Sequence, residues 1–220
     1  MEMSLHSAFP SRRPAALPHA WLPALLAVWL PSAALAATLN ADIRDTSGNP
    51  LPEAVIYAEP AGGGAPRTKR EVHIEQIDKT FVPLVTVVQT GTAVNFPNRD
   101  SIRHHVYSFS PAKIFEIKLF TGVPANPVTF DKPGEVVLGC NIHDQMIAYV
   151  LVVETPYFAK TGKDGKAKLE NLPAGHYRIK VWHYGAEAPA PQSLQLQAET
   201  TRDIAHKLAP RPHAPRPERK

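Results

Sequence analysis

The sequence is poor in three features that would each define a class of protein. It has a single cysteine, Cys140, among 220 residues, so no intrachain disulfide can form. It has few stretches with a 3.6-residue hydrophobic period, which argues against a helical fold. Its apolar stretch at residues 21–30 has about ten residues, whereas a membrane-spanning helix needs about 20. These absences exclude an intrachain disulfide scaffold and argue against a helical bundle and a helical membrane protein.

The net positive charge lies at the two ends of the chain. The formal net charge is +4, but the tail at residues 207–220 carries +4 and the first 36 residues carry +1. The body between them is therefore close to neutral, at −1. Because no folded face is predicted to be basic, the charge pattern gives no reason to expect nucleic-acid binding.

The first 36 residues have the pattern of an export signal. Arg12 and Arg13 precede the apolar stretch, and the small residues at positions 34–36 offer a cleavage site. We expect a periplasmic protein without stable membrane insertion that starts near Ala37, exported by the Sec or the twin-arginine route. An uncleaved anchor is the alternative. In that compartment a lone thiol is either buried and inert or protected, for example by a metal.

Abundant proline and short runs of β-branched and aromatic residues between turn residues predict an all-β chain. The expected strands span residues 38–44, 54–58, 71–76, 84–88, 93–96, 105–109, 114–119, 127–130, 135–139, 147–153, 166–169, 176–182 and 192–197.

Two segments far apart in the sequence resemble one family. Residues 38–59 resemble the opening of the transthyretin-like regulatory domain of carboxypeptidases. Residues 161–183 resemble its later hairpin, with an Asp164-Gly165 turn, a Leu-Pro-x-Gly turn at 172–175 and a strand bearing Tyr177. The resemblance implies a small immunoglobulin/transthyretin-like β-sandwich from residues 37–66 and 156–207, interrupted by a second domain at 67–155. One irregular sandwich is the alternative. Residues 208–220 are expected to be a disordered basic tail.

Three potential soft-metal ligands follow the apolar run at 135–139. Cys140, His143 and Met146 are spaced three residues apart. Two imidazoles, one thiolate and a weak axial thioether form the ligand set of mononuclear electron-transfer copper sites. His104 or His105, at the start of a predicted strand, supplies the second imidazole, since side chains alternate along a strand and only one of the pair faces inward.

Alternatives to this copper site concern the metal and one further ligand. Zinc is the alternative metal, although a thioether without a carboxylate is unusual for zinc. Asp144 is a further candidate oxygen ligand. His73, His176 and His183 have no partner at metal-ligand spacing and are expected to be surface or half-buried strand residues.

Residues 74–153 resemble the cupredoxins, and the ligand loop has the short spacing of amicyanin, as in periplasmic copper proteins of the methylamine-utilization type. This resemblance implies a Greek-key β-sandwich with one type 1 (blue) copper. Cys140, His143 and His104 would be equatorial ligands and Met146 the axial ligand. His105 stands where cupredoxins often have an asparagine, which leaves the choice between His104 and His105 open.

The function predicted from these residues is transfer of single electrons. Catalytic motifs such as a nucleophile elbow, a binuclear Cys-x3-Cys centre or the His-x-His pairs of multicopper oxidases are absent from the sequence, so no enzyme is predicted. The resemblance implies docking near His143, framed by Ile142 and Ile147, of a redox partner such as a c-type cytochrome or periplasmic dehydrogenase. The alternative is a non-redox module that binds carbohydrate or protein and stores, delivers or senses copper.

Overall fold

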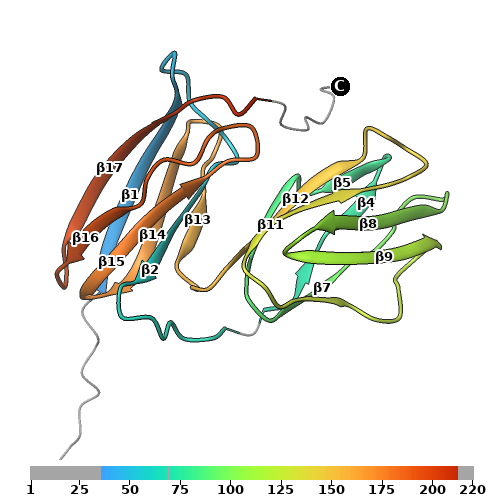
Figure 1. Ribbon diagram of the computed structural model, residues 1–220, viewed down its shortest axis with the longest axis horizontal. Helices are drawn as coiled ribbons and strands as arrows, with labels where there is room; N and C mark the ends of the chain where they lie inside the picture. Colours follow the sequence, from blue (N-terminus) through green and yellow to red (C-terminus); the bar gives the residue numbers. More distant parts are fainter. Residues whose placement is uncertain (1–35, 69, 213–220) are drawn as a thin grey trace, which may run out of the picture. The chain divides into compact units, whose positions relative to one another are not determined.

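A computed structural model describes residues 36–68 and 70–212 of the chain (Figure 1). These residues form seventeen β-strands and no helix, which confirms the prediction of an all-β chain. No helix in this part of the chain could therefore cross a membrane. Apart from Ala36, the first residue of strand β1, the predicted signal peptide lies outside the described residues.

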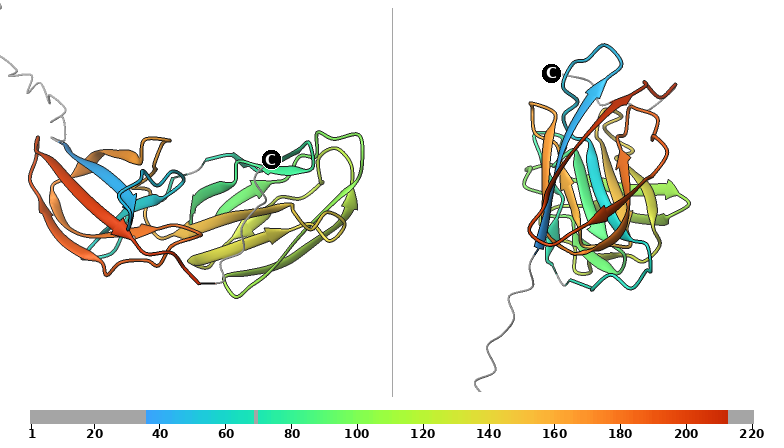
Figure 2. Two further views of the ribbon diagram at one scale, coloured as in Figure 1. Left: turned by 90° about the horizontal axis from the view of Figure 1, so that it is seen from above. Right: turned by 90° about the vertical axis from the view of Figure 1, so that its left-hand side faces the viewer.

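The first sandwich is built from the two ends of the described chain. One sheet has the order β14-β1-β17, made of Lys166–Pro173, Ala36–Asp45 and Thr201–Leu208. The other has the order β13-β2-β15-β16, made of Phe158–Lys160, Val55–Pro60, Gly175–Trp182 and Gln192–Leu196. Strand β1 pairs in parallel with β17, and Figure 2 shows these blue and red strands side by side.

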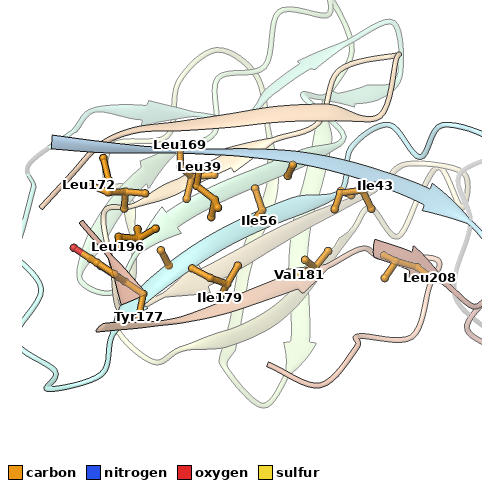
Figure 3. Packing of buried hydrophobic residues seen from close by; sticks show 14 of the residues in the cluster. Leu39, Ile43, Ile56, Leu169, Leu172, Tyr177, Ile179, Val181, Leu196 and Leu208 are labelled. Carbon is orange, nitrogen blue, oxygen red and sulfur yellow. The ribbon is translucent and has the colours of Figure 1, made fainter. Parts of the chain in front are cut away.

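Alternating side chains of β1 create the core of the first sandwich. Every second residue from Ala37 to Ile43 is buried, as expected for a strand with one face toward a core. Figure 3 shows Leu39 and Ile43 on this face, with Ile56 of β2 and Ile179 of β15 packed in the same cluster. Burial of these aliphatic groups is the main stabilising contribution in this half of the molecule.

The Leu-Pro-x-Gly segment does not close the hairpin that the sequence predicted. Strand β14 pairs with β1, whereas β15 pairs with β2 and β16, so the chain changes sheets at Ala174. The buried Tyr177 donates a hydrogen bond from its hydroxyl to the carbonyl of Pro173 at 2.8 Å. This bond ties the two strands together across the corner, in the manner of the tyrosine corners of immunoglobulin-like sandwiches.

The second sandwich is built from the middle of the chain. Its larger sheet has the order β6-β12-β11-β8-β9, made of Val85–Gln89, Ile147–Val153, Gly134–Gly139, His104–Ser110 and Lys113–Phe120. Its smaller sheet has the order β10-β7-β3, made of Val128–Phe130, Thr92–Asn95 and Val72–His73. A two-stranded ribbon pairs β4 (Glu75–Ile77) with β5 (Thr80–Val82).

The core of the second sandwich contains aromatic side chains and the sulfur atoms. Phe81, Phe96 and Phe130 are each at most 1% exposed, and Cys140 and Met146 belong to the same buried cluster. A third cluster joins Val55 and Trp182 of the first sandwich to residues of β6 and β12. The described residues from 36 onward belong to one compact unit, and the division into two domains stays a prediction.

The structure differs from the sequence predictions in three strands and at the start of the tail. Strands β5, β13 and β17 were not expected, because they are short or, in β17, largely polar. The predicted start of the disordered tail, residue 208, is also too early in the chain. Arg211 donates its backbone N–H to the carbonyl of Gly185 at 2.9 Å, and its side chain forms an ion pair with Glu135 at 2.9 Å. The rest of the predicted tail, from residue 213, lies outside the described residues.

Candidate metal centre

The site lies where one end of β8 meets one end of β11. His104 is the first residue of β8 and is fully buried, and Cys140 directly follows β11 with 3% exposure. Gly139 pairs with Tyr107 of β8, and a Cβ atom at Gly139 would lie 2.8 Å from the Tyr107 ring. Glycine at position 139 therefore leaves room for the Tyr107 ring to pack over the end of β11 just before the cysteine.

Three donor side chains converge at this place. His104, Cys140 and His143 each offer one ligand atom, and these atoms all lie within 4.8 Å of one another. The Cys140 Sγ atom is 3.9 Å from His143 Nδ1, and the rings of His104 and His143 have centroids 5.0 Å apart at 62°. Within residues 36–68 and 70–212, no other group of three His, Cys, Asp or Glu side chains converges in this way.

The loop between Cys140 and Met146 is closed by its own backbone. Met146 donates its backbone N–H to the carbonyl of His143 at 2.9 Å. The Met146 side chain is 1% exposed and belongs to the same buried cluster as Cys140. The thioether is thus held inside the sandwich beside the loop, whereas Asp144 is exposed to solvent.

Of the two adjacent histidines, His104 is the one that lies with Cys140 and His143. Strand alternation directs His105 to the opposite face of the sheet, where its Nε2 atom lies 2.9 Å from a carboxylate oxygen of Glu116. His105 is also beside the ring of Tyr107, with centroids 5.6 Å apart. It is therefore not a member of the donor group.

A carboxylate that the sequence reasoning did not select contacts His104. Asp100 places its Oδ2 atom 2.7 Å from His104 Nε2. Its two oxygens also accept the backbone N–H groups of Asp78 and Lys79, at 2.8 and 2.9 Å. Burial opposes ionisation, but these hydrogen bonds and His104 outweigh it and lower the pKa of the Asp100 carboxyl. The signal available in the sequence was the four-residue spacing of Asp100 and His104.

The loop that carries Asp100 is fixed by the buried Asn98. Its side-chain amide donates to the carbonyls of Ile102 at 2.8 Å and Phe120 at 2.9 Å, and its oxygen accepts the N–H of Asp100 at 2.9 Å. One side chain thus satisfies two backbone groups of the loop and one of strand β9.

The ionisation state of the site favours ligation. Burial, followed by the charges of His104 and Lys79, lowers the pKa of His143 below its ordinary value. A neutral imidazole is the form that binds a metal. The Nδ1 atom of His104 is buried and has no hydrogen-bond partner, which is costly unless another atom bonds to it. One thiol, two imidazoles and a buried thioether fit copper better than magnesium, calcium or zinc.

Comparisons with known proteins give similarity to copper proteins at low identity. No protein-family model matches the chain, and no curated protein matches it. A Cu-containing nitrite reductase from Thermus scotoductus SA-01 is 27% identical over 44% of this chain and 25% of its own, with a TM-score of 0.37. A purple cupredoxin from Nitrosopumilus maritimus is 20% identical over 38% of this chain and 100% of its own, with a TM-score of 0.34. A reduced Cu(I) form of an amicyanin mutant is 19% identical over 46% of this chain and 99% of its own, with a TM-score of 0.35.

These alignments cover less than half of this chain, and the one to the nitrite reductase covers a quarter of that enzyme. Similarity of this degree does not assign an activity. The functional argument therefore rests on the donor atoms and their surroundings.

Proposed function

We propose that residues 67–155 form a cupredoxin-like domain that binds one copper ion and carries single electrons between redox proteins. His104, Cys140 and His143 would be its equatorial ligands and Met146 its axial ligand. Residues 37–66 and 156–207 would form a transthyretin-like domain around it. The protein would act in the periplasm after removal of residues 1–36, without catalysing a reaction of its own.

The observation that carries this proposal is the convergence of three donor atoms within 4.8 Å. His104 and Cys140 are buried and held by the ends of two paired strands. Because the strands fix these side chains, the ligands would move little between two oxidation states. When bound, copper would supply a one-electron Cu(I)/Cu(II) couple, tuned by the thioether and by the apolar surroundings of the sulfur.

The partner would dock at the edge of the site where His143 reaches solvent. Ile142, the residue before it, is 47% exposed, and Ile102 in the loop that leads to His104 is 39% exposed. These side chains provide the small apolar contact that transient redox complexes use. Ile147, which was expected to frame the same patch, is instead partly buried in the cluster with Val55 and Trp182. A c-type cytochrome or a periplasmic dehydrogenase is the class of partner proposed.

Copper reconstitution of the purified mature chain tests the proposal. The wild type should bind one copper per chain, with an intense visible thiolate-to-copper absorption and the electron-spin-resonance signal of a mononuclear Cu(II) site. Cys140→Ser and His104→Ala should both lose that absorption, and the matched variant His105→Gln should keep it. Stoichiometric binding that survives Cys140→Ser unchanged would refute the assignment.

Voltammetry separates electron transfer from the copper-storage alternative. The electron carrier should show a reversible one-electron couple and exchange electrons rapidly with a cytochrome. A protein that binds copper but shows no reversible couple would support storage, delivery or sensing instead.

A further inference from the structure

We infer that Asp100 is a positioning residue for the proposed copper site: it fixes the tautomer of His104 so that Nδ1 faces the metal, and its charge favours the oxidised ion. The inference depends on the proposed function, because it concerns a ligand of that site. It adds a residue outside the ligand set and a direction for the reduction potential.

The first step concerns the position of one proton. Asp100 Oδ2 lies 2.7 Å from His104 Nε2, and both oxygens of the carboxyl accept backbone N–H groups, so neither oxygen is placed as a donor. An ionised carboxylate only accepts hydrogen bonds, so the proton of this contact belongs to His104 Nε2. A neutral His104 then has its lone pair on Nδ1, the atom that is buried without a hydrogen-bond partner.

The second step concerns what holds Asp100 itself. Its oxygens accept the backbone N–H groups of Asp78 and Lys79 in the turn between β4 and β5. Both turn residues have positive φ angles, of 51° and 57°. The N–H of Asp100 is held by Asn98 at 2.9 Å. The carboxylate is thus fixed from two sides before it contacts His104, and an outer carboxylate of this kind orients a ligating imidazole and raises its basicity.

The third step concerns charge. The Asp100 side chain is only 15% exposed, so its negative charge is weakly screened by solvent. A nearby negative charge stabilises Cu(II) more than Cu(I), because the oxidised ion carries the larger positive charge. Asp100 therefore lowers the reduction potential of the site relative to a neutral residue in its place.

The chain contains a matched control for this role. Glu116 contacts His105 at 2.9 Å in the same kind of carboxylate–histidine pair, one residue along the strand and on its other face. Glu116→Gln removes the charge from that pair without changing the donor group. Asp100→Asn makes the equivalent change beside the proposed ligand.

The experiment compares copper-loaded wild type, Asp100→Asn and Glu116→Gln. In Asp100→Asn, Cu(II) affinity should fall about 10–100-fold, Cu(I) affinity should fall less, the reduction potential should rise, and the thiolate-to-copper band should shift or weaken. Glu116→Gln should match the wild type in all four measurements. A purely structural role for Asp100 would lower the unfolding midpoint of the apoprotein and leave the potential and the band unchanged, which would overturn the inference. Equal effects of both variants would also overturn it.

A second measurement needs no substitution. Nitrogen-15 NMR of the histidine side chains in the wild-type apoprotein should find the His104 proton on Nε2, protected from exchange with solvent. A proton on Nδ1 would overturn the inference even if Asp100→Asn does not fold. If the wild type binds no copper, the proposed function fails, while the NMR result still shows whether Asp100 sets the tautomer.

Discussion

The two sandwiches differ in where they place apolar side chains. The large apolar side chains that are exposed among the described residues all belong to the second sandwich: Val82, Ile102, Phe109, Ile114, Leu119, Val123 and Ile142. The first sandwich buries its aliphatic residues between two sheets. A contiguous exposed apolar patch marks an interaction site, whereas single exposed apolar side chains are normal. The docking contact proposed for a redox partner would therefore lie on the second sandwich.

The sandwiches also differ in their buried polar groups. In the first, the buried Thr161 donates to the carbonyl of Leu51 at 2.7 Å and accepts the N–H of Ala54 at 2.9 Å. In the second, the Nδ1 atoms of His104 and His105 are buried without hydrogen-bond partners. Gln76 Oε1 and Thr86 Oγ1 of the second sandwich are buried in the same way. The first sandwich has three such atoms, of which Asp42 Oδ1 and Glu53 Oε2 form ion pairs with Arg44 and Lys160, whereas Nε2 of His206 has no ion pair. Unpaired polar groups lower stability, and they concentrate where a protein binds or reacts.

Core truncation in each sandwich gives the largest expected effects. Phe96→Ala should lower the free energy of unfolding by about 3–5 kcal/mol and Leu39→Ala by about 2–5 kcal/mol, since both side chains are at most 1% exposed and each truncation leaves a cavity. Urea denaturation measures both. Phe96→Ala should also weaken copper binding, whereas Leu39→Ala should leave it intact. Equal losses of copper affinity would remove the functional distinction between the sandwiches.

Acid should destabilise the first sandwich through His183. Sequence reasoning expected a surface or half-buried residue, but His183 is 7% exposed. Burial, opposed by a hydrogen bond to the Pro52 backbone and aided by the Arg211 charge, lowers its pKa to about 4. Above pH 6.5 the free energy of unfolding has its full value, because His183 is neutral in both the folded and the unfolded protein. As the pH falls from about 6.5 to 4, His183 takes up a proton in the unfolded chain but not in the folded chain. This lowers the free energy of unfolding by about 3 kcal/mol.

Denaturation curves of the wild type and His183→Gln between pH 7.5 and 4 (a window set by the usual histidine pKa of about 6.5) test this expectation. The substitution should remove most of the pH dependence in that range. If both proteins lose the same stability, another group is responsible.

The tyrosine corner should contribute a smaller amount. Tyr177→Phe removes the hydroxyl that binds the Pro173 carbonyl and should lower the free energy of unfolding by about 1 kcal/mol. Tyr157, whose ring contacts Tyr177, provides the control. Tyr157→Phe should change stability by less than about 0.5 kcal/mol. Thermal unfolding of the apoproteins distinguishes the two, and a neutral Tyr177→Phe would show that the corner is held by packing alone.

The exposed Ile142 should matter for rate and hardly for stability. Ile142→Ser should change the free energy of unfolding by less than about 0.5 kcal/mol, but it should slow electron exchange with a cytochrome roughly tenfold, if the docking contact is worth about 1.4 kcal/mol. Ile114→Ser is the matched control, because Ile114 is 70% exposed on the hairpin of β8 and β9. Stopped-flow kinetics should find the control at the wild-type rate. Equal slowing would place docking elsewhere.

The sequence predicted those parts of the fold that depend on local pattern. Alternating apolar residues in β1 and the apolar run at β12 identified these strands closely. The polar strand β17 was missed because its position is set by parallel pairing with β1, a contact between the two ends of the chain. The Leu-Pro-x-Gly turn was recognised, but its change of sheet depends on partners that a local pattern does not specify.

The candidate site was also only partly predictable. Cys140 and His143 lie in one short loop, so their spacing alone brought them together. The choice between His104 and His105 needed the orientation of β8, which decides the face of the sheet on which each lies. Asp100 was not selected as a site residue, because its role appears only when the turn at Asp78 and Lys79 folds against it.

The most direct test of the account is X-ray absorption at the copper edge of the reconstituted wild-type chain. The account predicts one short copper–sulfur distance from Cys140, two copper–nitrogen distances from imidazole and at most one longer sulfur contact. A coordination shell of nitrogen and oxygen alone would contradict it, since the buried thiolate would then take no part in binding the metal.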